Sequence, residues 1–326
     1  MQLTIEAATE LAATTLTRHG MSVAHARQVA DHLVDAALCG HEFSSLPRIL
    51  AIVEELRAKG AASAIRVTRE DGCFAHVDGG DSIGYVVSLA AVDKAIEICR
   101  RTGVAVVTAN NTWFSGRCAF YVQRAAAQGL VAMHTTNTTA RVAPFGGTER
   151  LMGTNPFAIA FPSDDDPVVI DIGTSAITWG DVVLMRAKGE ALPAGVAVDA
   201  QGRITLDPTA ALEGAFMPWG GQRGSALAIA VQLLGVLAGS RVLIEDTSNY
   251  GLFFVVIDPE RIAPGGQFKR QVSAMRKTIE ANPPLANVER VRVPGDGSQG
   301  RRKRALQSGT VTLDDKVYAR ILALGH

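Results

Sequence analysis

The chain has 326 residues, 47% of them hydrophobic and 20% charged, which is typical of a globular protein with one large domain or two to three smaller ones. Its 32 basic residues balance its 32 acidic residues, so a nucleic-acid partner is not expected. The four cysteines are widely spaced and form no CxxC pair. This spacing argues against a disulfide framework or a metal site and favours a reducing cytosol.

The first hundred residues are helical in pattern. The N-terminus lacks the basic start and apolar core of a signal peptide, which favours a cytoplasmic protein. Ser22 can cap a helix that ends at Gly40, and an irregular polar elbow, HEFSSLP, follows. Apolar positions at helical spacing predict helices over residues 4–19, 22–39, 48–59 and 81–101.

Strand-like runs begin at residue 104. The apolar run 226–238 is too short to span a bilayer and contains Gln232, so it predicts a buried helix and no membrane partner. A loop is predicted over 294–306. Strands are predicted at residues 104–108, 130–135, 157–161, 168–171, 242–244 and 253–257. The remaining helices are predicted at residues 120–128, 225–237, 268–280 and 314–324.

This order predicts a helical N-terminal cap, a central α/β body and a helical insertion around residues 210–240. No GxGxxG follows a first strand, so a classical dinucleotide fold is not indicated. Small-residue turns alternate with strands between residues 152 and 224, and such turns can wrap a phosphate or a nicotinamide. The pattern favours an enzyme that binds a nucleotide in a less common way.

Several motifs occur in an order that resembles one known family. They are GHEF (40–43), GTNPFAIAFP (153–162), VVIDIGTS (168–175), GVAVDAQGRITLDP (195–208), GGQRG (220–224) and VPGD (293–296). Together they resemble the malate/L-lactate dehydrogenase family of the second type, and the resemblance covers nearly the whole chain. That family includes ureidoglycolate dehydrogenase, diketogulonate reductase, sulfolactate dehydrogenase and the cyclic ketimine reductases. The resemblance implies hydride transfer with NADH or NADPH, and a homodimer.

The resemblance also implies a fold class and a division into domains. The fold is expected to be α/β and non-Rossmann, with a mixed, largely antiparallel central sheet, an N-terminal helical domain and a helical insertion. Residues 1–103 are expected to form the helical and dimerisation region, joined by 285–326. Residues 104–210 and 241–284 are expected to bind the cofactor, and residues 211–240 to form the insertion.

Two family histidines are replaced in this chain. The family's elbow pattern G-x-D-S-H-G-x-x-R keeps its arginine as Arg48, but Ser44 stands at the general-acid histidine and Phe43 at the preceding serine. In the second pattern, N-S-x-H-F-G, Phe114 is kept and Trp113 stands at the histidine. The usual ketone and alcohol mechanism therefore lacks its family acid.

Four residues are candidates for substrate binding and catalysis. A guanidinium matches a carboxylate in two parallel hydrogen bonds, so Arg48 is the candidate clamp, and a surface arginine is the plainer reading. The Thr154 hydroxyl lies in a turn where the family binds substrate, although it can equally stabilise the turn. Ser44 and Asp181 are the catalytic candidates. Asp181 can pair with a cationic imine or hold a water, and otherwise it is a solvated acid.

The missing acid favours a C=N substrate over a C=O substrate. Reducing a ketone builds an alkoxide that needs a proton donor, whereas an imine can arrive already protonated. The favoured function is therefore reduction of a cyclic imine bearing a carboxylate, similar to piperideine- or pyrroline-2-carboxylate. A 2-hydroxy-acid dehydrogenase that uses His41 or a water stays open. So does a catalytically silent relative that keeps only nucleotide binding.

Cofactor contacts are expected from glycine-containing turns, whose backbone amides can bind phosphate. NADPH is favoured by resemblance to the ketimine reductases, and NADH is possible. Trp113 either walls the nicotinamide pocket or packs in the core. The basic run Arg301–Arg304 is expected to be a solvated loop. The cofactor candidates are Trp113, Phe114, Ser115, Gly116, Arg117, Ile172, Gly173, Thr174, Gly180, Gly221, Gln222, Arg223 and Gly224.

Overall fold

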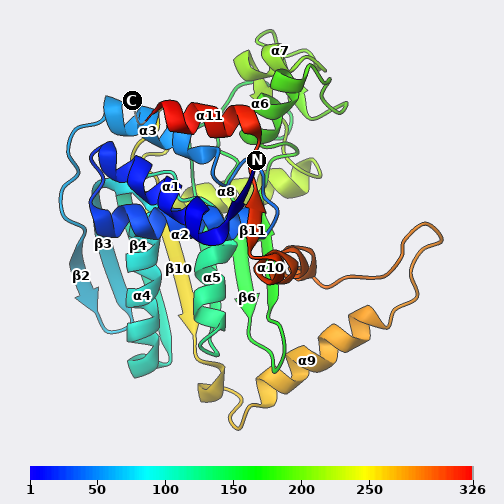
Figure 1. Cartoon of the computed structure of the whole chain (residues 1–326). Coiled ribbons are helices and arrows are strands. Elements are labelled where there is room, and N and C mark those ends of the chain that lie inside the picture. The colour runs from blue at the N-terminus through cyan, green and yellow to red at the C-terminus, as the bar shows by residue number, and fades with distance from the viewer. Residues whose placement is uncertain (325–326) are drawn as a thin grey trace. The chain divides into compact units, whose positions relative to one another are not determined.

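The computed structural model describes residues 1–324 (Figure 1), and the chain divides into two compact units. The first unit comprises Met1–Ala62 and the chain from Ser273 onward, and the second comprises Ser63–Val272. Each unit is described by itself. The expected division into a dimerisation region, a cofactor domain and an insertion stays a prediction. A division into compact units does not show which part binds a cofactor or a second subunit.

The first unit is built from helices and one short pair of strands. β1 (Gln2–Thr4) pairs antiparallel with β11 (Thr310–Thr312), so the two ends of the chain are hydrogen-bonded to each other. Thr4 caps α1 by accepting a hydrogen bond from the Ala7 amide, and Ser22 caps α2 through the His25 amide, as predicted. The helices are α1 (Ile5–Arg18), α2 (Val23–Leu38), α3 (Arg48–Ala58), α10 (Asp296–Ser308) and α11 (Asp315–Ala323).

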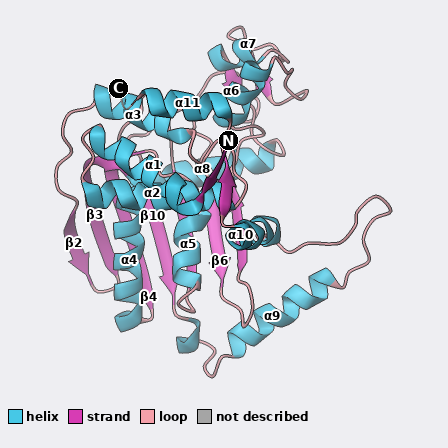
Figure 2. Cartoon of the chain, viewed as in Figure 1, coloured by secondary structure: helices cyan, strands magenta, loops and turns pink. Residues whose placement is uncertain are grey.

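The second unit contains a seven-stranded sheet in the order β2-β3-β4-β10-β5-β6-β7 (Figure 2). β3 and β4 run parallel, and every other neighbouring pair in this sheet is antiparallel. The mixed, largely antiparallel α/β class is confirmed. The strands are β2 (Arg66–Asp71), β3 (Phe74–Ile83), β4 (Val104–Trp113), β5 (Val131–Thr136), β6 (Phe157–Phe161), β7 (Val168–Ile172) and β10 (Leu252–Ile257).

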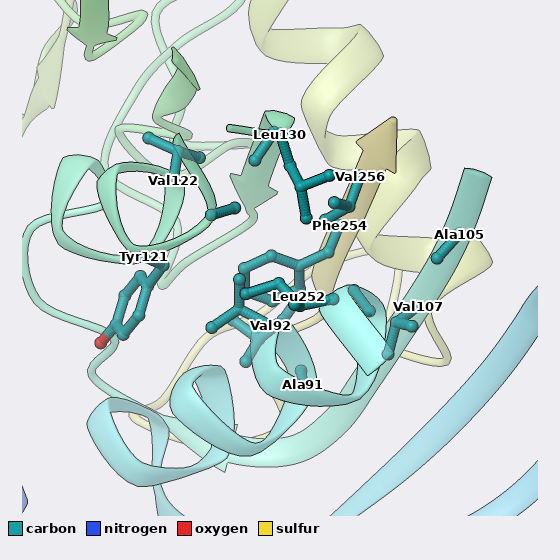
Figure 3. Packing of buried hydrophobic residues seen from close by; sticks show 14 of the residues in the cluster. Ala91, Val92, Ala105, Val107, Tyr121, Val122, Leu130, Leu252, Phe254 and Val256 are labelled. Atoms are coloured by element: carbon teal, nitrogen blue, oxygen red, sulfur yellow. The ribbon is translucent and has the colours of Figure 1, made fainter. Parts of the chain in front are cut away.

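The main core of this unit lies between the sheet and two helices, α4 (Gly84–Thr102) and α5 (Ala119–Ala126). The Phe254 side chain on β10 is fully buried and packs near Val92 and Tyr121 (Figure 3). Strand positions facing the helices are often alanine, as at Ala105, which lets the helices approach the sheet closely. Burying each large apolar side chain here stabilises the fold by about 1.5–3 kcal/mol.

A smaller substructure follows β7. It comprises α6 (Trp179–Lys188), β8 (Ala197–Val198), α7 (Pro208–Glu213) and β9 (Ala215–Phe216), around a separate apolar cluster that includes Val142 and Phe216. α8 (Gln222–Leu237) then packs on β5 and β10. No helix among residues 1–324 is long and apolar enough to cross a membrane.

One predicted strand is absent, and one predicted helix begins later than expected. Residues 242–244 form no strand, because their carbonyls accept single hydrogen bonds, at Val242 from Gln232 Nε2 (2.8 Å) and at Ile244 from the Ala140 amide (2.7 Å), instead of joining a ladder. The helix predicted from residue 81 begins at Gly84, since β3 continues to Ile83.

The buried helix predicted over residues 226–238 is present as α8, but it is buried on one face only. One face of α8 packs inward through Ala228, Val231 and Gly235. The opposite face exposes Leu233 by 61% and Leu237 by 68%. An apolar sequence without periodicity gives no signal for which face is covered.

Candidate functional site

The GTNP turn is fixed by the buried side chain of Asn155. Its backbone has a left-handed φ of 34°, which asparagine tolerates better than most residues. Asn155 Nδ2 donates to Ala228 O (3.0 Å) and to Gln232 Oε1 (2.9 Å), both on α8, and Oδ1 accepts from the Thr138 amide (3.3 Å). The turn and α8 are therefore held together by one amide group, which the sequence analysis did not single out.

The GTNP turn is also joined to the loop after β7. The Thr174 amide and hydroxyl both donate to Thr154 O, each at 3.0 Å. Thr174 O in turn accepts from the Trp219 amide (2.8 Å), just before the glycine loop. Among the described residues the Thr154 hydroxyl makes no hydrogen bond, which leaves it available to a substrate oxygen. The structure thus brings Thr154, Thr174 and the GGQRG loop together; Ile172 and Gly173 precede Thr174 directly, at the exposed end of β7.

The glycine loop before α8 suits an anion. Gly220 and Gly221 have positive φ angles of 59° and 62°, and no side chain of the described residues caps the helix. The first amides of α8, at Gln222, Arg223 and Gly224, are therefore not satisfied by a cap, and such amides bind phosphate readily. Arg223 is exposed and adds a positive charge beside them.

The turn after β4, unlike the glycine loop before α8, begins with a buried aromatic side chain. The Trp113 indole is 1% exposed and its Nε1 donates to Asp81 O (2.9 Å), so the ring packs as a core residue. Phe114 follows with a left-handed φ of 42°, and Gly116 has a φ of 70°. Ser115 O accepts from the Tyr121 hydroxyl at 2.5 Å.

A carboxylate occupies the N-terminus of α5, where this turn ends. Asp171 Oδ2 accepts from the Ala119 amide at 2.8 Å. The residue keeps exposed surface, but surrounding protein atoms desolvate the carboxyl enough to raise the pKa of Asp171, opposed by the Ala119 amide and the Arg117 charge. Arg117 is itself buried and donates to Gln123 Oε1 (3.2 Å). A negative group there disfavours a phosphate at this turn.

Asp181 closes a capping box at the start of α6. Its carboxylate accepts from the Thr178 hydroxyl (2.7 Å) and amide (3.3 Å), while the Asp181 amide donates to Thr178 Oγ1 (3.1 Å). Gly180 beside it is buried. Capping explains an aspartate at this position without any catalytic role.

Ser44, Arg48 and the alternative acid His41 belong to the first unit, and the other candidate residues belong to the second. Arg48 begins α3, with its guanidinium carbon 5.5 Å from the centre of the Phe43 ring. Ser44 is partly exposed. His41 Nε2 lies 3.3 Å from Ser298 Oγ on α10.

The predicted loop over residues 294–306 is wrong, because Asp296–Ser308 form α10. The basic run is partly bonded to α2: Arg301 Nε donates to Cys39 O (2.7 Å) and Arg302 Nε pairs with Asp35 Oδ1 (2.7 Å). Partners distant in sequence override the low helix propensity of the two glycines and two serines in α10. The signal that could have revealed this helix is Gly309, a left-handed glycine at its end.

A substitution at Gly40 tests the contact between Arg301 on α10 and the chain at the end of α2. A Cβ at Gly40 would lie 2.4 Å from Arg301 Nε, and the glycine has a φ of 77°. Gly40→Ala is expected to lower the free energy of unfolding by about 2–4 kcal/mol, since it adds loss of a charged hydrogen bond to backbone strain. Gly20 is the matched control, with a φ of 92° and open space; Gly20→Ala should cost about 1 kcal/mol. Urea denaturation measures both.

In an Arg301→Ala background, the extra cost of Gly40→Ala should disappear, because no side chain is left to displace. Equal costs for Gly20→Ala and Gly40→Ala in the wild-type background would contradict the close contact described above.

Comparison with known proteins places these features in a family. The sequence pattern of the malate/L-lactate dehydrogenase family matches residues 3–322. The chain is 34% identical to a malate dehydrogenase of Pyrococcus horikoshii, over 86% of this chain and 83% of that protein. It is 31% identical to a Delta(1)-pyrroline-2-carboxylate/Delta(1)-piperideine-2-carboxylate reductase of Pseudomonas aeruginosa, over 99% of each. The solved structure of the sulfolactate dehydrogenase of Methanocaldococcus jannaschii superposes with a TM-score of 0.89 at 29% identity, over 99% of this chain and 96% of that one.

The match spans both units and includes every motif in which the candidate residues lie. The chain therefore belongs to the malate/L-lactate dehydrogenase family of oxidoreductases.

Proposed function

We propose that this protein reduces a small carboxylate-bearing cyclic imine, similar to piperideine- or pyrroline-2-carboxylate, with a nicotinamide cofactor. The observation that carries the proposal is that Trp113 is a buried, hydrogen-bonded side chain at the position where the resemblance places a histidine. Its one polar atom, Nε1, donates to Asp81 O at 2.9 Å in a nearly fully buried site. An indole N–H can donate a hydrogen bond, but it does not release its proton as a general acid near neutral pH. A substrate that arrives protonated needs no such acid.

The residues around α8 fit the phosphates of a dinucleotide. A helix N-terminus without a side-chain cap, two left-handed glycines and the exposed Arg223 form one anion-accepting loop. The cofactor supplies the hydride when it is bound. We favour NADPH on the resemblance to the ketimine reductases, with NADH as the alternative. In the turn after β4, the Ala119 amide at the start of α5 already donates to the Asp171 carboxylate. This turn is therefore proposed to contact uncharged parts of the cofactor.

Four residues are proposed to act on the substrate. Arg48 would hold the carboxylate in a two-point contact. The Thr154 hydroxyl, which bonds no described residue, would orient the ring. Asp181 would offset the positive charge of the iminium, and that role requires it to share its carboxylate with the capping box. Ser44 would donate a hydrogen bond in place of the family histidine.

A 2-hydroxy-acid dehydrogenase is the second candidate, and His41 is the observation that favours it. Its imidazole is partly exposed next to the elbow, and Nε2 lies 3.3 Å from Ser298 Oγ. An imidazole can act as a general acid, so His41 is the candidate for the missing one.

Oxidation of NADPH with piperideine-2-carboxylate and with pyruvate, followed at the near-ultraviolet absorbance of the cofactor, separates these candidates. We expect faster turnover of the imine. Faster turnover of pyruvate would sink the imine proposal and point to His41 or a water as the acid. Cofactor binding without turnover of either compound would identify a catalytically silent relative.

Two further properties belong to the same proposal. We propose a homodimer, as the family resemblance implies; the exposed Leu233 and Leu237 on α8 are apolar surface that a second copy could cover. A cytoplasmic location is proposed because the four cysteines are all free, as expected in a reducing compartment.

A further inference from the structure

Gln232 is a polar side chain on the buried face of α8, and it bonds two segments outside the helix. Its exposed fraction is 8%, in a stretch of sequence that carries no charge between Arg223 and Arg241. Nε2 donates to Val242 O at 2.8 Å, and Oε1 accepts from Asn155 Nδ2 at 2.9 Å. A buried carboxamide is costly without partners, so both bonds are needed at this position.

The backbone groups at the two ends of this chain of hydrogen bonds fix the direction of every donor. Val242 O can only accept, so the Gln232 nitrogen faces it and the Gln232 oxygen faces Asn155. The Thr138 amide can only donate, so Asn155 Oδ1 faces it at 3.3 Å and Asn155 Nδ2 turns toward α8. Neither side chain can be replaced by an apolar group of the same shape without breaking the chain.

Gln232 provides one of the two acceptors that the Asn155 amide nitrogen requires. Asn155 Nδ2 has two hydrogens, and they face Ala228 O (3.0 Å) and Gln232 Oε1. The Asn155 side chain is fully buried, so bulk water cannot replace a lost acceptor. Without Gln232 Oε1, one buried N–H is left unpaired, which favours a rotated amide and a moved backbone. That backbone carries Thr154 directly before Asn155.

We propose that Gln232 is a positioning residue for the reaction, and that it acts through Asn155 on the Thr154 hydroxyl. The proposal rests on the function proposed above, in which that hydroxyl orients the substrate ring. Gln232 reaches the GTNP turn, whereas the glycine loop is held separately by the bond from the Trp219 amide to Thr174 O. Its role is therefore in placing the substrate rather than the cofactor. A displacement of about 1 Å in a positioned group can lower a rate about a hundredfold.

Two substitutions of Gln232 separate the two ends of its side chain. Gln232→Glu keeps an oxygen for Asn155 Nδ2 and loses the nitrogen that faces Val242 O, whereas Gln232→Leu loses both. The assay uses saturating NADPH and whichever of piperideine-2-carboxylate and pyruvate the wild type reduces faster. Gln232→Leu should lower kcat/KM by about tenfold to a hundredfold, and Gln232→Glu should recover at least fivefold of that loss. The Kd of NADPH should change by less than about threefold in both variants.

Ser240→Ala is the matched control, because it removes another buried hydrogen bond beside the same helix. Ser240 is 8% exposed, and its Oγ accepts from Asn137 Nδ2 at 2.6 Å. The Asn137 side chain stays held by the Gly251 amide (2.7 Å) when this bond is lost. We expect a lower urea midpoint in all three variants, but Ser240→Ala should keep the wild-type kcat/KM within about twofold. A loss of stability alone would therefore not explain a selective loss in Gln232→Leu.

Hydrogen exchange of two backbone amides reports the position of the GTNP turn without any turnover. The Thr138 amide donates to Asn155 Oδ1, and the Thr174 amide donates to Thr154 O. Mass spectrometry of the peptides that contain these amides should show at least tenfold faster exchange in Gln232→Leu than in the wild type, and a smaller increase in Gln232→Glu. Gln232→Met takes the place of the leucine variant if that variant does not fold by circular dichroism.

Three results would overturn the proposal. Unchanged exchange of both amides in a folded Gln232→Leu or Gln232→Met variant would show that the turn does not depend on this side chain. Faster exchange with an unchanged kcat/KM would show that the turn does not place the substrate. A higher Kd of NADPH with an unchanged kcat/KM would assign Gln232 to the cofactor loop. If the wild type reduces neither compound, the proposed function fails, and the exchange measurement still decides whether Gln232 holds the turn in place.

Discussion

Gly224→Ala is expected to weaken NADPH binding by more than tenfold and to lower the free energy of unfolding by about 3–5 kcal/mol. A Cβ at Gly224 would lie 1.8 Å from Trp219 O, with Trp219 C and N at 2.8 and 2.9 Å. All three are backbone atoms, so no flexible side chain can absorb the overlap. The loop must move, and the Trp219 amide would be pulled from Thr174 O. The substitution therefore disturbs the turn proposed to bind phosphate and the loop after β7 together.

Gly220→Ala separates this close approach from ordinary glycine strain. Gly220 belongs to the same loop and has a φ of 59°, but a Cβ there would meet nothing within 4 Å. Its replacement should cost about 1 kcal/mol and leave NADPH affinity within a few-fold of the wild type. Fluorescence titration of NADPH and urea denaturation measure both quantities. If the two variants bind NADPH equally well, the loop before α8 does not hold the cofactor.

The three helix N-termini near the predicted cofactor turns show why a glycine turn is a weak signal by itself. At α5 the Ala119 amide is taken by Asp171, and at α6 the cap is made by Thr178 and Asp181. At α8 no side chain within the described part of the chain makes a cap. The sequence shows a small-residue turn at each place. Only the contacts distinguish the helix that can accept a phosphate.

The apolar strands and capped helices were predictable because their signals are local. β5, β6 and β10 are short apolar runs, and Ser22 marks the start of α2. β2 was missed because all six of its residues are exposed, so it shows no apolar alternation. The turn that follows it does carry a signal, Asp71-Gly72, and Gly72 has a φ of 58°.

The candidate site could be predicted only where a motif carried it. Thr154, Thr174 and the glycine loop were singled out through the family resemblance, and the structure joins these segments by hydrogen bonds, while their functional roles stay predictions. Asn155 was not found, because its role depends on partners far away in the chain. Asn155 bonds α8, 73 and 77 residues later.

Asn155→Asp should be the most destabilising conservative substitution in the GTNP turn. The Asn155 side chain is fully buried, and its Nδ2 faces two acceptor oxygens, Ala228 O and Gln232 Oε1. A carboxylate of the same shape would place negative oxygen against both. At pH 8 we expect a loss of about 3–5 kcal/mol in the free energy of unfolding, the usual cost of an uncompensated buried charge. Asparagine and aspartate tolerate a left-handed backbone equally, so the φ of 34° is not disturbed.

The pH dependence of this loss identifies its cause. Burial and the two facing acceptors favour the neutral acid, so the pKa of a carboxyl at position 155 is raised above its unfolded value of about 3.9. The folded variant then holds its proton where the unfolded chain has released it. Its stability is therefore greatest below about pH 4 and is lost as the pH rises through the raised folded pKa.

Urea denaturation of the wild type and Asn155→Asp at pH 5 and pH 8 should show a larger deficit at pH 8. Asn282→Asp is the control, because Asn282 is exposed, and its effect should stay within about 0.5 kcal/mol at both values. An equal deficit for Asn155→Asp at both pH values would mean that the lost amide donor, and not the buried charge, dominates. No deficit at either pH would mean that α8 does not depend on this side chain, and the link from Thr154 to the proposed phosphate loop would rest on Thr174 and Trp219 alone.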